Sequence, residues 1–190
     1  MISSIIGGIM DANKAIKQNK AKKDDTTQTV VVQNRYSIEI PSFLKPSSKY
    51  KEDASLNYLN KTLDCGVMVI EDTKSDFDAM YETLKNQDYD SDTEKSMLEY
   101  FSTLFVGNMF DLEKNEADID NWVETTVNGL NAIMMEAFQK RTFFKDAAHY
   151  RLGFIEGRDT IYTICVTVGG SSISKIGDKF EGVIESFIEL

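Results

Sequence analysis

The C-terminal third of the chain has the clearest alternation of apolar and polar residues. Trp122–Val127 and Leu130–Phe138 flank Asn128-Gly129, a pair suited to the positive φ angles of a two-residue hairpin turn. Tyr150–Ile155 carries apolar residues at every second position, and Thr160–Val168 is apolar on both faces, as in a strand covered on both sides. The pattern therefore predicts four consecutive strands.

An amphipathic helix is predicted to close the chain. Ser171 or Ser172 can cap its N-terminus by accepting a hydrogen bond from a free backbone N–H group. Apolar residues then recur every three or four positions and form one stripe: Ile173, Ile176, Phe180, Val183, Ile184 and Phe187. Because Gly177 and Gly182 each weaken an isolated helix by about 1 kcal/mol, we expect this helix to depend on packing against the sheet.

The first half of the chain supplies further strands and helices. Tyr36–Ile40, Ser55–Asn60 and Cys65–Glu71 read as strands, and Asp118–Asn121 is expected to form a single helical turn. Two helices are predicted between Glu71 and Asp118 from apolar residues at helical spacing: Phe77, Met80, Tyr81 and Leu84 in the first, then Met97, Leu98, Phe101, Leu104 and Phe105 in the second. Runs of strands interrupted by helices favour an α+β fold with an antiparallel sheet.

Residues 1–35 differ in charge from the rest of the chain. They carry six cations and three anions, whereas residues 36–190 carry fifteen cations and twenty-eight anions within a total net charge of −10. We therefore divide the chain into an N-terminal amphipathic and polar tail with its linker, 1–35, and a domain, 36–190. The acidic domain argues against nucleic-acid binding, because it repels phosphate.

The tail begins with four isoleucines at partly helical spacing, which are the candidate partner-binding residues: Ile2, Ile5, Ile6 and Ile9. So short a helix is marginal in water by itself. The tail is therefore either disordered, docked on its own domain, or bound to another copy, another protein or a membrane surface. The chain shows no basic signal-peptide region and no apolar run of about 20 residues, so a cytoplasmic, bacterial-type protein is expected.

The apolar pattern resembles that of PsbP-like proteins, a family that shares its fold with the Ran-binding Mog proteins. Tyr36–Leu44 looks like their first strand and turn, Ala54–Asn60 and Val67–Glu71 like the next two strands, and Val127–Ala132 like a hairpin found there. The closing strand and a helix over Phe180–Phe187 also fit, so the resemblance covers about residues 36–190.

This resemblance implies a central antiparallel sheet with helices on both faces, an α/β/α sandwich. It also implies a protein that is not an enzyme, since most members are not. They include a photosystem assembly and oxygen-evolution subunit, a Ran-binding protein, envelope lipoproteins and chaperones for type VI secretion effectors. The fold alone does not choose among these functions.

One acidic segment has the spacing of a calcium-binding loop. Its weak candidate ligands are Asp88, Asp90, Asp92 and Glu99. Thr93 stands where the loop requires glycine, and Lys95 replaces the usual apolar residue. The simpler interpretation is a capping box over Ser91–Glu94 that opens the following helix.

The other candidate chemistry is sparse. Gly169–Lys175 follows a strand as a phosphate-binding loop does, but it lacks the second glycine and the Ser or Thr after the lysine, so a turn with an N-cap is preferred. His149 is expected at the surface near a strand end. Cys65 and Cys165 are expected to be buried free thiols, and one histidine with two distant cysteines cannot form a closed zinc site. No cofactor is predicted.

A run of carboxylates precedes the C-terminal strands, and it is either a solvated face or a grip for a basic partner: Asp111, Glu113, Glu116, Asp118 and Asp120. The sequence favours a non-catalytic protein-interaction module. A narrower hypothesis is a secretion-associated chaperone or immunity-type protein that shields a toxin segment, and the third is a hydrolase that uses carboxylates.

Overall fold

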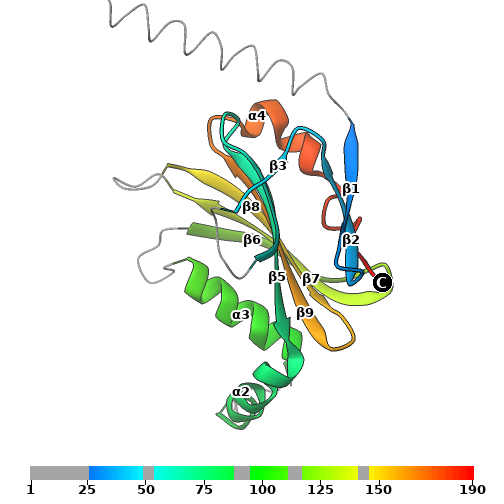
Figure 1. The fold of residues 1–190 in the computed structure, drawn as a ribbon. Helices are drawn as coiled ribbons and strands as arrows, with labels where there is room; N and C mark the ends of the chain where they lie inside the picture. Colours follow the sequence, from blue (N-terminus) through cyan, green and yellow to red (C-terminus); the bar gives the residue numbers. More distant parts are fainter. Residues whose placement is uncertain (1–25, 49–53, 88–94, 111–116, 141–145) are drawn as a thin grey trace, which may run out of the picture.

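A seven-stranded antiparallel sheet forms the centre of the protein. The computed structural model describes residues 26–48, 54–87, 95–110, 117–140 and 146–190, and the sheet order is β3-β4-β5-β9-β8-β7-β6 (Figure 1). The strands are β3 (Lys45–Pro46), β4 (Ala54–Asn60), β5 (Cys65–Thr73), β6 (Ala117–Val127), β7 (Leu130–Gln139), β8 (Ala148–Glu156) and β9 (Thr160–Gly169). The α+β class and the four consecutive C-terminal strands are confirmed.

A small second sheet has the order β1-β2-β10. Its strands are β1 (Thr27–Val32), β2 (Tyr36–Pro41) and β10 (Ile188–Glu189). Strand β1 was not predicted from the sequence, although all six of its residues pair with β2. Gln33 and Asn34 have φ angles of 48° and 56° and form the tight turn between these strands. Residues 1–25, with Ile2, Ile5, Ile6 and Ile9, lie outside the described part of the chain.

Helix α3 (Met97–Met109) lies along one face of the large sheet, and α2 (Lys74–Gln87), which follows β5, packs against α3 near the end of that strand (Figure 1). Phe101 of α3 packs edge-on against Phe77 of α2 at 5.4 Å and against Phe154 of β8 at 6.2 Å. The helix predicted to open at Ser91 begins at Met97 instead. Its N-cap is Ser96, which exchanges hydrogen bonds with Glu99 in a capping box. No helix in the described ranges is long and apolar enough to cross a membrane.

The opposite face is covered by the small sheet and by the C-terminal segment, residues 173–187. Five of the six residues of the predicted stripe are buried and Ile173 is partly buried, but the prediction of a single long helix is wrong. The helical part ends after α4 (Ile173–Ile176) and the 3-10 turn η2 (Gly177–Phe180). Gly182, with φ +78°, then turns the chain toward β10, which must be extended to pair with β2. Helices on both faces are therefore not confirmed.

An aromatic cluster fastens the C-terminal segment to both sheets. The ring of Phe187 lies 5.3 Å from that of Tyr36 on β2 and 4.8 Å from that of Tyr162 on β9. The Tyr36 hydroxyl is 2.8 Å from the Ser55 hydroxyl, and the Tyr162 hydroxyl donates to Glu189. Each phenol therefore keeps a polar partner while its ring is buried.

Replacing Phe187 with alanine should destabilise the whole domain. Phe187 is fully buried between two rings, so Phe187→Ala is expected to lower the free energy of unfolding by about 3–5 kcal/mol. Urea denaturation measures the change. Phe138→Ala is the matched control, because this ring is 43% exposed and should cost under about 1 kcal/mol. Equal losses for the two variants would contradict this packing.

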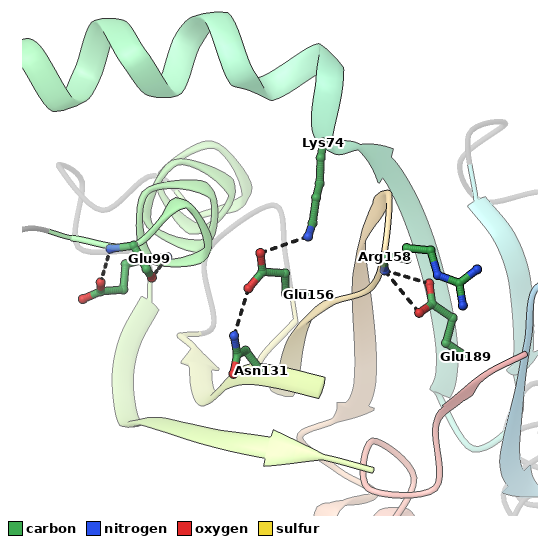
Figure 2. Close-up of polar contacts among 7 residues, drawn as sticks. Lys74, Glu99, Asn131, Glu156, Arg158 and Glu189 are labelled. Carbon is green, nitrogen blue, oxygen red and sulfur yellow. Dashed lines mark hydrogen bonds and ion pairs between the residues drawn. The ribbon is translucent and has the colours of Figure 1, made fainter. Parts of the chain in front are cut away.

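A second anchor joins α2 to the sheet through Glu156 (Figure 2). Its carboxylate accepts from Lys74 Nζ at 3.0 Å and from the amide of Asn131 at 3.2 Å. Burial raises the pKa of Glu156, but these donors outweigh burial and hold the pKa below its ordinary value. The ionised carboxylate therefore adds stability that is lost as pH falls through its folded-state pKa.

Glu156→Gln tests this linkage. The variant should unfold more easily than the wild type at neutral pH, by about 1 kcal/mol, and the difference should shrink as the pH is lowered into the acid range and the wild-type carboxylate is protonated. Thermal unfolding across this pH range measures it. Glu124→Gln, which removes an exposed carboxylate, should show no such pH-dependent difference. A gap for Glu156→Gln that stays constant down to acid pH would refute the assignment.

Candidate functional site

The face of the large sheet that carries the C-terminal segment is open over β6 and β7. Val123 on β6 and Phe138 on β7 are 52% and 43% exposed. Val123 lies directly opposite Met134, and Phe138 is four residues farther along β7, so all three share one face. We call these three residues the apolar patch. Val123 and Met134 are neighbours across the strand pair, whereas Phe138 lies about 13 Å farther along β7 with Glu136 between them, so the patch is an apolar strip interrupted by one carboxylate.

A polar row runs beside the apolar patch. The strand register places Phe138 opposite His149 and Glu136 opposite Arg151. Glu136, His149 and Arg151 border a groove of about 550 Å³ between the sheet and the C-terminal segment, which we call the acidic groove. Its floor is apolar: Val166, Val168, Ile173 and Phe180. Its polar rim is Glu136, His149, Arg151, Asp178, Glu181 and Glu185.

The rim carries more negative than positive charge. Arg151 binds Glu185 at 3.1 Å and approaches Glu136 at 3.7 Å, and His149 lies 3.7 Å from Glu136. Within the described residues, the carboxylates of Asp178 and Glu181 have no ion-pair partner and are exposed. One guanidinium therefore faces four carboxylates. Such a groove attracts cations.

Strand β6 extends the same acidic character to the edge of the sheet. It is the outermost strand, so one of its edges has no strand partner in the described ranges. Asp118–Asn121, expected as a helical turn, lies within β6. A bulge there centres on Asn121, with φ +53°. Asp118 pairs with Lys140 at 2.9 Å, and Asp120 accepts from the Asn121 N–H at 2.8 Å.

The histidine and the cysteines do not form a nucleophilic pair. Cys65 and His149 are both register partners of Val168, on opposite sides of β9. They are therefore two strand spacings apart, roughly 10 Å. Cys165 packs in the core under the helices, on the other face of the sheet. Both cysteines are free and buried, as predicted.

The candidate metal ligands are not gathered into a site by the described residues. Glu99 is engaged in the capping box of α3, whereas Asp88, Asp90 and Asp92 lie outside the described ranges. Within those ranges, no three His, Cys, Asp or Glu side chains cluster in a way that could hold a metal ion. Asp111, Glu113 and Glu116 also lie outside them.

The loop Gly169–Lys175 opens a helix of four residues, α4. Ser172 is its N-cap, but its hydroxyl is buried and makes no hydrogen bond. So short a helix has few aligned peptide dipoles with which to hold a phosphate. The segment therefore forms a turn that leads into a helix, as predicted, but the Ser172 side chain does not make the expected capping hydrogen bond.

Comparison with known proteins identifies the fold. Cyanobacterial PsbP from Synechocystis sp. PCC 6803 matches over 87% of this chain and 94% of its own, with 12% identity and a TM-score of 0.57. A Pseudomonas aeruginosa protein of unknown function (10% identity, 86% and 97% covered, TM-score 0.43) and a Bacteroides thetaiotaomicron protein (9%, 86% and 48%, 0.47) are more distant. No family model and no curated protein matches the chain.

The chain therefore has a PsbP-like fold, and the resemblance drawn from the sequence is confirmed at that level. Sequence reasoning did not find the acidic groove. The sequence does contain one signal of the groove, because Glu136 interrupts the apolar residues of β7 and Arg151 interrupts those of β8. Charged residues inside apolar strands mark a face that is not fully covered.

The cysteines should be chemically inert in the folded protein. Burial, together with the nearby Asp64 carboxylate, raises the pKa of Cys65 to about 12. At about pH 8 its thiolate fraction is then roughly a thousandfold below that of an ordinary thiol. Iodoacetamide labelling followed by mass spectrometry should show very slow modification of Cys65 in the native state and rapid modification in urea. Native labelling at the rate of a free thiol would contradict the burial.

Proposed function

We propose that the protein is a non-catalytic binding module that holds an extended, basic and apolar segment of a protein partner. The segment lies on the apolar patch and in the acidic groove. The observation that carries this proposal is the register position of exposed Phe138 beside a groove on whose rim Asp178 and Glu181 have no ion-pair partner among the described residues.

The two parts of the face have different roles. Partner lysines or arginines would pair with Asp178 and Glu181, and this favours a basic segment and speeds its association. Exposed pairs of this kind add little affinity by themselves. Most of the binding energy would come from covering Phe138 and Val123, because aromatic and aliphatic anchors dominate interfaces.

The edge of β6 that has no strand partner in the described part of the chain suits an added strand of the partner. Its backbone groups can pair with an extended segment, a common mode of peptide recognition. A second copy of β6 is a poor partner, because Asp118, Asp120 and Glu124 would face the same acids across the new strand pair. A basic strand turns the same charges into attractive pairs. This also supports the narrower hypothesis of a chaperone-like protein that shields a basic segment of its client.

Selection from a random peptide library tests the proposal without a known partner. Displayed 12-residue peptides selected on the full-length protein should be enriched in Lys or Arg alternating with apolar residues. Their affinity, measured by fluorescence anisotropy, should fall when salt is added, because exposed charge pairs are screened. Enrichment of acidic peptides, or of none, would overturn the proposal.

Variants then locate the site. Phe138→Ala, and separately Asp178→Lys combined with Glu181→Lys, should each weaken the selected peptide by about tenfold or more, equivalent to about 1.4 kcal/mol. Asp159→Lys is the matched control. It reverses one exposed charge at the β8–β9 turn, away from the groove. Equal effects at Asp159 and in the groove would show a non-specific charge effect and contradict the assigned face.

A further inference from the structure

The N-terminal segment of the chain has the chemistry that the acidic groove would select. Residues 12–23 contain five lysines and no acidic residue: Lys14, Lys17, Lys20, Lys22 and Lys23. The four isoleucines of residues 1–9 precede them. A basic run next to apolar anchors is the kind of partner segment proposed above, and this inference rests on that proposed function.

The chain enters the described domain close to the groove. The Ser42 N–H donates to the Thr26 carbonyl at 3.1 Å, and the two hydroxyls are 2.6 Å apart. The next residue, Phe43, packs edge-on against Phe180 with 6.1 Å between ring centroids. Phe180 belongs to the floor of the acidic groove. Figure 1 likewise shows β1 on the side of the large sheet that carries α4.

The segment is long enough to reach across this face. Twenty-five residues span up to about 80 Å when extended, at about 3.3 Å per residue, and the lysine run alone spans about 40 Å. A folded domain of this size is roughly 40 Å across. Because the segment is tethered beside the groove, its effective concentration there is on the order of millimolar. Weak intrinsic affinity would then suffice for occupancy.

We propose that residues 1–25 of the same chain occupy the acidic groove when no partner is bound, and so compete with the partner. The lysines pair with Asp178 and Glu181, and the isoleucines lie against the apolar patch. A partner binds by displacing this segment. The apparent affinity of the protein for the partner is therefore proportional to the fraction of molecules in which the groove is empty.

The first test is carbodiimide cross-linking of the full-length protein, which joins a lysine to a carboxylate only when they are in contact. Mass spectrometry should find links from the lysine run to Asp178 or Glu181. Mixing ¹⁴N- and ¹⁵N-labelled protein distinguishes links within a chain from links between chains. Links only between chains would assign the groove to a second copy and overturn the inference.

Charge reversal supplies the control. Changing the five lysines of the run to glutamate should abolish these links, and adding Asp178→Lys with Glu181→Lys should restore them with the charges exchanged. Persistent loss in the exchanged protein would count against a direct contact. Asp178 and Glu181 are exposed, and thermal unfolding verifies that both variants fold.

Peptide binding separates this inference from the proposed function. The peptide selected above should bind a full-length chain whose five lysines are changed to glutamine, which removes the positive charge without adding carboxylates, about tenfold more tightly than it binds the wild type. Equal affinities, with no links within the chain, would overturn the competition and leave the proposed function standing. Failure of the peptide to bind either chain would instead overturn the proposed function.

Discussion

The packing of the C-terminal segment against the large sheet is the interaction on which the rest of the structure depends. Phe187 joins Tyr36 of the small sheet to Tyr162 of the large one, so one side chain ties three parts of the fold together. Gly153 allows the close approach, since a Cβ there would lie 2.4 Å from Ile184 Cγ2. The position of the segment also decides which part of the sheet stays open.

The two faces of the sheet are covered to different extents, and this difference creates the candidate site. Helix α3, with α2 packed against it, buries one face, and the ring of Phe101 meets those of Phe77 and Phe154 edge-on. On the other face, the C-terminal segment covers β8 and β9 and leaves Val123 and Phe138 exposed on β6 and β7. The same segment brings Asp178 and Glu181 to the border of that open area. Residues 173–187 therefore both cover part of the sheet and supply part of the candidate site.

Sequence periodicity predicted the elements whose signal is local. The β6–β7 hairpin follows from alternation and Asn128-Gly129, and the buried positions of residues 173–187 follow from their apolar spacing. The prediction of one long helix was wrong because apolar residues at helical spacing can also be buried by a short helix, a 3-10 turn and a loop that pack against the same core. Strand β1 was missed because its residues were counted with the tail and linker, although Thr27, Thr29 and Val30–Val32 are β-branched and favour a strand. The acidic groove could not be predicted, because strand register and a turn bring its rim residues together, and no local pattern encodes either. Its rim includes Glu136, Arg151 and Glu181.

The most direct test of the account is to map the bound surface by NMR. ¹⁵N-labelled full-length protein would be titrated with a peptide of alternating lysine and valine residues, and the amide shifts followed. The account predicts that the largest shifts lie on β6 and β7 and in residues 178–185. Amide shifts confined to α2 and α3, or to the β8–β9 turn, which lies away from the groove, would contradict the proposed binding face.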